Sequence, residues 1–386
     1  MNEKWERLIK KLDGLKNLAP IGFADSVGVG ISAIFWFYLA SIAEVEEFGE
    51  LHYFIGIAGV GFTLALLGTQ HSVIVYIAKN VKIGSTLFLI SIVGGIVAGL
   101  VIFGIFFRFD ISLLLIGYII NELGIGYLLG KKSFIRYSKF ILIQKTLTFT
   151  LGVGFFHIFG IEGIIFALAL SYSHFIIIIF KEFRDTKIDF SLIKSKSDFL
   201  INNYLYHLSG GLKGNIDKLI IGPLLGFGLL GNYAVSLQFY GVLIMFSSIA
   251  FKYLLPQDSS GSSNIKLKKG IVFLSIGISI LGSLILPEII PSIFPKYTSA
   301  VDAVRIISLS VFPATITMIY TSKFLALEKS RIVLGSSVIA VITQVTFIII
   351  LGPILGIIGI ATSFLANSVA SGIFLAIVNK YSKYSK

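Results

Sequence analysis

Apolar runs of roughly 20 residues recur from one end of this chain to the other, separated by short polar segments. As an α-helix, a run of that length crosses the hydrocarbon core of a bilayer, which is about 30 Å thick. We count twelve such runs, and the pattern predicts a membrane-spanning helix over each: 20–43, 52–77, 83–107, 111–130, 140–158, 161–180, 199–226, 231–255, 270–293, 302–326, 331–352 and 355–378. The segments between them are short. The fold class predicted is therefore an all-α polytopic membrane protein without a sizeable soluble domain.

Composition agrees with this fold class and limits the chemistry. The 386 residues are 55% hydrophobic, with a mean hydropathy of +0.92, far above the soluble range. There is no cysteine, and the five scattered histidines show no close metal-ligand spacing. No nucleophile elbow is present, and the stretch nearest to a P-loop follows a membrane span rather than a strand. The sequence predicts no metal, no cofactor and no enzyme activity.

Basic residues concentrate in alternate connecting segments. With the N-terminus inside, the outer segments carry only Arg108 and Lys296, and the first of them, EVEEFGE at 44–50, is acidic. This asymmetry follows the positive-inside rule and places both termini in the cytoplasm, with the chain in the cytoplasmic membrane. The net charge of +12 is thus explained by topology, and we predict no nucleic-acid partner.

The chain divides near its middle. The most polar interior stretch, 181–198, is interpreted as a cytoplasmic linker between an N-terminal lobe at 20–180 and a C-terminal lobe at 199–379. Six spans in each lobe give both the same orientation, which is the parallel type of transporter repeat. Residues 1–19 are either an amphipathic interfacial helix or a solvated basic leader, and 380–386 form a cytoplasmic tail.

Short internal matches support a duplication. IFGIEGI at Ile158–Ile164 matches ILGIIGI at Ile354–Ile360, and each stretch joins the last two spans of its lobe. Just upstream, Gln144 and Thr146 correspond to Gln344 and Thr346. The sequence therefore predicts a duplicated architecture of two six-helix lobes.

Ionisable residues inside the predicted spans are the candidates for function. Each costs about 2.5–3.5 kcal/mol on insertion scales and usually faces a bundle interior or a watery cavity. The candidates are Asp25, Glu122, Lys145, Lys213, Asp217, Lys218 and Arg305.

The seventh span carries a polar and small stripe. Asn203, His207, Gly210, Gly214 and Asp217 recur at spacings of three and four, so they share one helical face. One interpretation is a helix that lines a cavity and meets a polar substrate. The other is close helix packing at the glycines, with Lys213 and Asp217 neutralising each other at i, i+4. Lys218 has no partner within its helix on this pattern and is expected to face the cavity or pair with another helix.

The other charges have competing interpretations. Lys145 either contacts substrate or snorkels to the interface. Arg305 either contacts substrate or pairs with Asp302, three residues away. Asp25 and Glu122 are candidates for coupling to an ion or proton, and for Glu122 pairing with a lysine competes.

Several stretches together resemble a known family. NIDKLIIGPLLGFGLLGNYAVSLQ, which begins at Asn215, is similar to the seventh-span signature of polysaccharide (O-antigen type) flippases of the multidrug/oligosaccharidyl-lipid/polysaccharide exporter superfamily. There an Asp–basic pair precedes an apolar run and a G-x-Y motif, matched here by Gly231–Tyr233. Residues 43–80, 293–334 and 354–369 resemble the first to second, ninth to eleventh and last spans of that family.

The resemblance implies two six-helix lobes around a central cavity that work by alternating access. It also implies a polyprenyl-diphosphate-linked oligosaccharide as the substrate, moved from the cytoplasmic to the outer leaflet. A diphosphate needs cationic partners, and Lys218, Lys213, Lys145 and Arg305 are available, with Asn203 and His207 as polar candidates. Asp25, Glu122 or Asp217 would couple to a proton or sodium ion. Membrane lipids are the remaining expected partners.

Two alternatives stay open. A cation-coupled multidrug exporter of the same superfamily would have its cavity dominated by acids, especially Asp25. A membrane-embedded glycan polymerase or transferase would normally carry a large outer loop with catalytic residues, whereas the outer segments here are all short.

Overall fold

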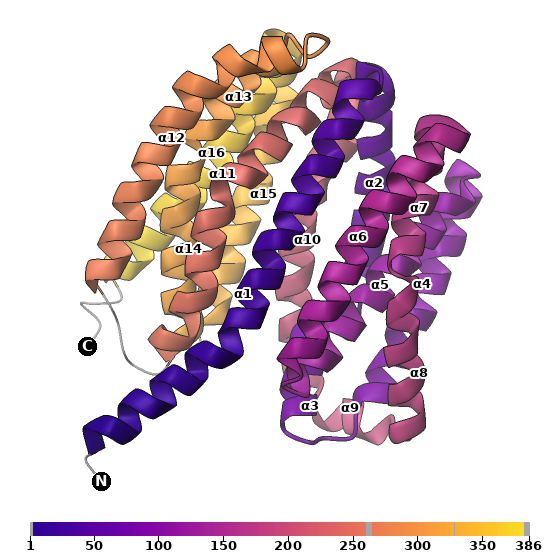
Figure 1. Ribbon diagram of the computed structural model, residues 1–386, viewed down its shortest axis with the longest axis vertical. Coiled ribbons are helices and arrows are strands. Elements are labelled where there is room, and N and C mark those ends of the chain that lie inside the picture. The colour runs from indigo at the N-terminus through magenta and orange to yellow at the C-terminus, as the bar shows by residue number, and fades with distance from the viewer. Residues whose placement is uncertain (1–2, 260–264, 328, 382–386) are drawn as a thin grey trace. The chain divides into compact units, whose positions relative to one another are not determined.

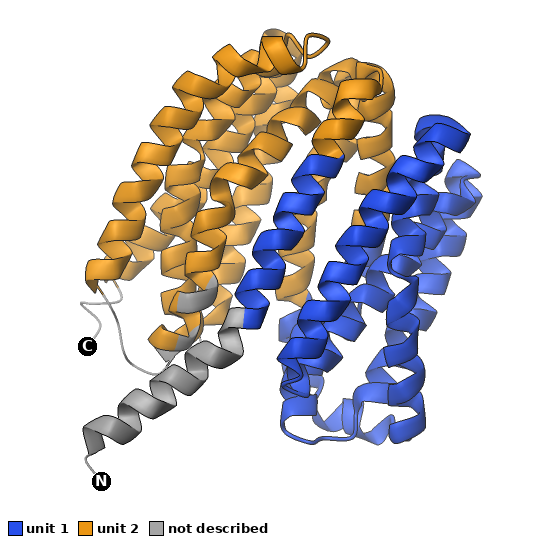
Figure 2. Ribbon diagram, viewed as in Figure 1, with its two compact units in different colours: residues 1–35, 61–204 blue, residues 36–60, 205–386 orange. Residues whose placement is uncertain are grey.

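The computed structural model describes residues 3–259, 265–327 and 329–381, and for residues 3–19 it describes the backbone alone. Over these ranges the chain is helical, without a strand, as the hydropathy pattern predicts (Figure 1). The chain divides into two compact units, residues 1–35 with 61–204 (unit 1) and residues 36–60 with 205–386 (unit 2) (Figure 2). The helices α1, α2 and α10 contribute residues to both units.

The helices are bounded as follows: α1 Glu3–Ile42, α2 Val45–Ala65, α3 Gln70–Ala78, α4 Gly84–Phe106, α5 Phe109–Gly130, α6 Phe134–Phe159, η1 Gly160–Glu162, α7 Gly163–Ser171, η2 Ser173–Phe175, α8 Ile176–Asp185, α9 Ser191–Ser195, α10 Ser197–Leu225, α11 Phe227–Ser259, α12 Ile265–Ile293, α13 Ala300–Leu309, α14 Val311–Ala326, α15 Ser330–Leu355 and α16 Ile357–Tyr381.

Ten helical segments of the described chain are long and apolar enough to cross a membrane. One of them, 134–185, contains two of the predicted spans. The predicted seventh span corresponds to α10, which is not among the ten and carries Lys213, Asp217 and Lys218 in its central part. Each of the twelve predicted spans therefore coincides with one helix or with consecutive helices.

Three predicted spans are not continuous α-helices, which corrects the sequence prediction. The second span breaks between α2 and α3, where the Thr69 hydroxyl accepts a hydrogen bond from the Ser72 amide and caps α3. The sixth breaks at the 3-10 turn η2, and the tenth breaks at Ser310. The acidic segment 44–50 is not a loop either, because α2 begins at Val45 and places Glu46 and Glu47 in its first turn. Acids are favourable there because a helix N-terminus carries partial positive charge.

The internal repeat appears as two equivalent turns. Gly160 and Gly356 have positive φ angles of 69° and 54°, and they join α6 to α7 and α15 to α16. Three residues later, a Cβ on Gly163 would lie 2.8 Å from the Phe155 carbonyl oxygen. A Cβ on Gly359 would lie 2.2 Å from the carbonyl oxygen of Leu351. Each of these pairs is separated by 196 residues (155 and 351, 160 and 356, 163 and 359), so the duplication has a structural basis.

That spacing corrects one predicted match. Gln144 and Gln344 are 200 residues apart, one helical turn out of register, and the repeat instead equates Thr148 with Gln344 and Ser171 with Asn367. In unit 1 the Thr148 hydroxyl lies 3.0 Å from the hydroxyl of Ser171. In unit 2 the Asn367 amide donates to Gln344 Oε1 at 3.1 Å. The two lobes thus carry polar pairs of different size at equivalent places.

The segment after α8 is anchored to unit 1. The Ser85 hydroxyl donates to the carbonyl oxygens of Glu182 (2.9 Å) and Thr186 (3.0 Å). The Thr86 hydroxyl accepts from the Asp189 amide at 2.8 Å. The Ser191 hydroxyl and amide both donate to the Asp189 carboxylate, and these bonds lower its pKa.

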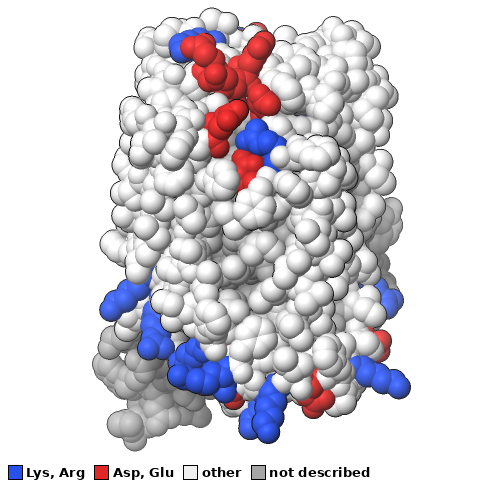
Figure 3. All heavy atoms as spheres, turned by 90° about the vertical axis from the view of Figure 1, so that its right-hand side faces the viewer, with Lys and Arg blue, Asp and Glu red and all other residues white. Residues whose placement is uncertain are grey.

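Basic side chains gather at one end of the helices in unit 1. Lys131 and Lys132 follow α5, and Arg136 lies in the first turn of α6. On the face shown in Figure 3, most of the Lys and Arg side chains lie along the lower edge, together with a few Asp and Glu.

Candidate functional site

A buried polar network surrounds Asp217 on α10. The side chain is 3% exposed. Its Oδ2 accepts hydrogen bonds from the Tyr233 hydroxyl (2.7 Å) and from the Gln344 amide (3.3 Å). Its Oδ1 accepts from the Lys218 backbone amide (2.8 Å) and from Lys218 Nζ (3.3 Å). A carboxylate in this setting is held by four donors, which is how a buried charge is retained in a protein interior.

The network continues to a fourth helix and ends at an acceptor. Asn367 on α16 is 1% exposed and donates its amide N–H to Gln344 Oε1 at 3.1 Å. Its own Oδ1 is buried and has no hydrogen-bond partner among the described residues. Carboxylate, amide and phenol oxygens from α10, α11, α15 and α16 therefore lie together. Oxygen atoms are the ligands that hard cations prefer, and the same carboxylate can hold a proton.

A close helix crossing positions Tyr233. A Cβ on Gly231 would lie 2.1 Å from the Val45 carbonyl oxygen, and a Cβ on Gly49 would lie 2.0 Å from the Phe227 carbonyl oxygen. The start of α2 and the start of α11 can approach this closely because both positions are glycine. Next along the chain, Asn232 Oδ1 accepts from the Ala300 amide at 2.9 Å and caps the start of α13. The G-x-Y motif thus packs the helices, and its tyrosine reaches Asp217.

Lys218 is satisfied largely within its own helix. Its Nζ donates to the Gly214 carbonyl oxygen at 2.7 Å as well as to Asp217, and its side chain is 12% exposed. Gly56 on α2 covers the stem, since a Cβ there would lie 3.0 Å from Lys218 Cβ. The expectation that Lys218 lacks a partner in its helix is wrong, because a lysine can bend back to a carbonyl one turn earlier.

Lys213 differs from Lys218. The sequence alternative that paired it with Asp217 is not what the structure shows, because Asp217 pairs with Lys218 instead. No described carboxylate forms an ion pair with Lys213, and its side chain is partly buried. A Cβ on Gly210 or Gly214 would meet no atom within 4 Å, so these glycines do not serve close helix packing. Lys213 lies on α10 between these two open positions.

Unit 1 holds the second group of candidates. The Tyr137 hydroxyl on α6 donates to Asp25 Oδ1 on α1 at 2.9 Å. Lys145 lies two turns further along α6 and interacts electrostatically with Asp25. Its stem packs on α1, where a Cβ on Gly28 would lie 3.2 Å from Lys145 Cγ. The structure therefore brings Asp25 and Lys145 together.

Glu122 on α5 interacts electrostatically with two phenols, those of Tyr137 and Tyr172. No described lysine forms an ion pair with it, so the alternative of lysine pairing is not observed. A carboxyl group among phenols in a membrane helix is a candidate proton site.

The remaining candidates are placed as follows. Arg305 forms an ion pair with Asp302 at 3.6 Å, which is one of the two interpretations of the sequence. Both side chains are half exposed. The Asn203 amide donates to the Ser72 hydroxyl at 3.4 Å within unit 1. His207 belongs to the part of α10 in unit 2. The stripe along α10 is therefore shared between the two units.

Sequence reasoning missed two residues of the network. Asn367 was not singled out, and Gln344 was noticed as a repeat position without a chemical role. The 196-residue spacing of the internal repeat could have indicated them, because it makes Gln344 equivalent to Thr148 and Asn367 equivalent to Ser171. Among the described residues no three His, Asp or Glu side chains form a metal-binding group. Of the four residues Asp217, Tyr233, Gln344 and Asn367, only Asp217 is a carboxylate.

Comparisons with known proteins give the fold. No protein-family model matches the chain, and no curated protein sequence matches it. Among solved structures, the lipid II flippase MurJ in an inward closed conformation aligns with a TM-score of 0.75 at 12% identity, over 95% of this chain and 87% of that one. An inward-facing multidrug resistance MATE family transporter of the MOP superfamily aligns with a TM-score of 0.67 at 14% identity, over 94% and 95% of the two chains.

The chain has the fold of these transporters. A third similar structure is a MOP superfamily transporter from Pyrococcus furiosus, described by a reverse polarity of its binding pocket that suggests a different function. It aligns with a TM-score of 0.56 at 17% identity over 96% of each chain. At these identities the likeness establishes the two-lobe helical fold, and the substrate must be argued from this chain's own residues.

Proposed function

We propose that this protein is a transporter that flips a polyprenyl-diphosphate-linked oligosaccharide from the cytoplasmic to the outer leaflet of the cytoplasmic membrane, with both termini in the cytoplasm. The fold shared with a lipid II flippase and with MATE transporters supports membrane transport by alternating access. The basic ends of the helices in unit 1 support the orientation.

The observation that carries the proposal is Lys213. It is a cation in a membrane helix, it has no described carboxylate partner, and the glycines beside it leave open space. An unpaired cation in a membrane helix is costly, so a transient anionic partner gives a physical reason for it. A diphosphate supplies oxygens for charge-assisted hydrogen bonds. Lys145, which interacts electrostatically with Asp25, is a second candidate contact.

The coupling ion is proposed to act at Asp217. The oxygens of Asp217, Gln344, Asn367 and Tyr233 offer a set of ligands for a sodium ion, and Asp217 alone can accept a proton. Asp25 and Glu122 in unit 1 are the alternative proton sites. In our proposal Lys218 is the resident counter-ion of Asp217, and it leaves when a cation binds.

We expect Lys213→Gln to reduce flipping of a diphosphate-linked glycolipid about tenfold or more, because one charge-assisted hydrogen bond contributes roughly 1.5–3 kcal/mol. The measurement is the accessibility of a fluorescent undecaprenyl-diphosphate glycolipid in proteoliposomes containing the purified variant. Lys296→Gln is the matched control, since Lys296 is an exposed lysine already paired with Glu44 at 2.6 Å. Normal flipping by Lys213→Gln at equal protein levels would overturn the assignment of Lys213.

A cation-coupled multidrug exporter is the second candidate. It is favoured by one observation, the acids Asp25 and Glu122 in unit 1, of which Glu122 forms no ion pair with a described lysine. On that proposal Glu122→Gln abolishes the efflux of a lipophilic cation such as ethidium, and Lys213→Gln leaves it intact. Measuring both variants with both substrates separates the two functions.

A further inference from the structure

We propose that the groove between the first turns of α12 and the middle of α14 binds an anionic membrane phospholipid, with the headgroup phosphate on Lys269 and an acyl chain along the groove. The groove has a volume of about 390 Å³ and belongs wholly to unit 2. Its lining residues are Ile265, Lys268, Lys269, Val272, Phe273, Ile276 and Ile319. Nothing in the proposed transport cycle uses it.

One face of α12 supplies most of the lining. Ile265, Lys269, Val272, Phe273 and Ile276 follow helical spacing and form a single stripe. The stripe carries one basic residue, Lys269, near its N-terminal end, and its other members are apolar. Phe273 is 79% exposed. Because α12 is one of the membrane-crossing helices, lipid is what meets an exposed apolar stripe of this kind.

Only some of the lysines at the groove are neutralised by a carboxylate, and the remaining positive charge favours an anionic headgroup. Lys268 is already paired with Asp258 at 2.6 Å, and Asp258 also accepts from the Ser322 hydroxyl at 2.7 Å. Lys269 is exposed and forms no ion pair with a described carboxylate. Lys266 is exposed one turn earlier. Two lysines at the N-terminal end of a helix present positive charge to a phosphate at headgroup level, and basic pockets between membrane helices recognise anionic lipids in this way.

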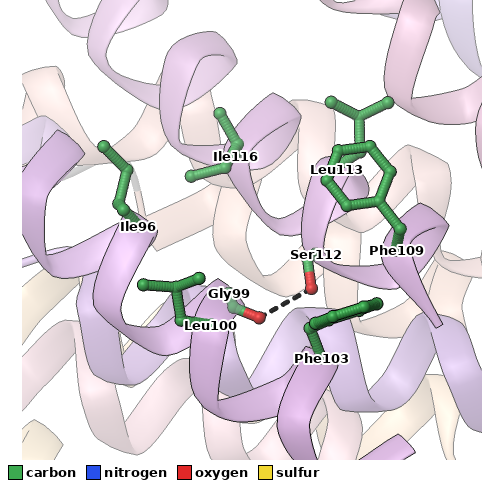
Figure 4. Close-up of a pocket in the computed structure, with 8 residues that line it drawn as sticks. All are labelled: Ile96, Gly99, Leu100, Phe103, Phe109, Ser112, Leu113 and Ile116. Carbon is green, nitrogen blue, oxygen red and sulfur yellow. Dashed lines mark hydrogen bonds between the residues drawn. The ribbon is translucent and has the colours of Figure 1, made fainter. Parts of the chain in front are cut away.

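A second groove provides a control within the same protein. It lies between α4 and α5 in unit 1, has a volume of about 320 Å³ and is lined by apolar side chains, with the Ser112 hydroxyl donating to the Gly99 carbonyl oxygen (Figure 4). The nearest basic residue in sequence, Arg108, is paired with Asp110 at 2.7 Å. This groove offers an acyl chain the same apolar lining without an uncompensated cation.

The test uses brominated lipids, which quench tryptophan fluorescence on contact. Both native tryptophans are replaced by phenylalanine, and a single tryptophan is introduced as Phe273→Trp or, for the control groove, as Leu100→Trp, at a position that is 65% exposed. The proteins are reconstituted in phosphatidylcholine containing a small fraction of brominated phosphatidylglycerol or brominated phosphatidylcholine. We expect the Phe273→Trp protein to be quenched preferentially by the anionic lipid, and the Leu100→Trp protein to show no preference.

Removing the charge should remove the preference. At about 1 kcal/mol per lysine near a lipid headgroup, Lys269→Gln in the Phe273→Trp protein is expected to lower the preference about fivefold. Lys296→Gln, at an exposed lysine outside the groove, should leave it unchanged. An unchanged preference in Lys269→Gln would overturn the proposal, as would an equal preference at Leu100→Trp. Absence of quenching by either lipid would show that a second copy of the chain covers the groove, and would also overturn it.

Discussion

Asp217→Asn is expected to abolish cation-coupled transport and to lower the stability of the protein. The substitution keeps the size of the side chain and removes the charge that holds Lys218. Removing one partner of a buried ion pair costs about 3 kcal/mol or more, because the other charge remains buried without compensation. The network also loses its only carboxylate, and with it the group that would bind a sodium ion or a proton.

The double variant Asp217→Asn/Lys218→Gln separates the two effects. Because it removes both charges, we expect its thermal unfolding temperature to return close to that of the unchanged protein. Transport should stay uncoupled, since no carboxylate is restored. The measurements are thermal unfolding of the purified proteins with and without sodium, and flipping in proteoliposomes under sodium or proton gradients. Ion-dependent flipping by either variant would contradict the coupling role of Asp217, and full stability of Asp217→Asn would contradict the ion pair.

Gly231→Ala is expected to destabilise unit 2 by about 3 kcal/mol and to reduce the amount of folded protein. A Cβ at this position would lie 2.1 Å from the Val45 carbonyl oxygen and 3.0 Å from its carbon. These are backbone atoms, so the clash can be relieved only by separating α11 from the start of α2. Forced overpacking of this kind costs about 1–3 kcal/mol or more. Tyr233 would be displaced from Asp217 by the same movement.

Gly241→Ala on the same helix is the matched control. A Cβ there would meet no atom within 4 Å, and alanine is favoured over glycine in a helix by roughly 0.5–1 kcal/mol. We expect its unfolding temperature to be unchanged or slightly raised, measured by fluorescence in detergent alongside Gly231→Ala. Equal unfolding temperatures for the two variants would show that the crossing at Gly231 is looser than its geometry indicates.

The hydropathy pattern predicted the helices better than their interruptions. All twelve runs became helices or consecutive helices, because a backbone crossing a bilayer must satisfy its hydrogen bonds within the segment. The breaks at Thr69 and Ser310 were not predicted. A serine or threonine in an apolar run is also common in continuous membrane helices, so its capping role depends on whether the neighbouring backbone turns.

The sequence pointed to the candidate residues, but the partners that it predicted for several of them were wrong. Asp217, Lys213 and Lys218 were found because charge inside an apolar run is rare and costly. Spacing along one helix suggested Lys213 as the partner of Asp217, whereas the structure gives Lys218, Tyr233 and Gln344. The other three helices of that network are α11, which follows α10 after a turn, and α15 and α16, which are separated from it by whole spans. The periodicity of residues within one helix carries no information about contacts between helices.

The sequence by itself determined that this is a helical membrane protein built from two related halves, since hydropathy, charge asymmetry and the repeated glycine turns are all properties of local composition. The sequence also determined which few ionisable residues lie inside the membrane spans, where a charge is costly and therefore calls for an explanation. The tertiary structure alone decided which of those charges are already neutralised. Asp217 is held by Tyr233 and Gln344 from other helices, Arg305 is paired with Asp302, and Lys213 forms no ion pair with a carboxylate of the described residues. The physical reason is that the cost of a charge depends on the groups within a few ångströms of it, and in a helical bundle most of those groups come from elsewhere in the chain.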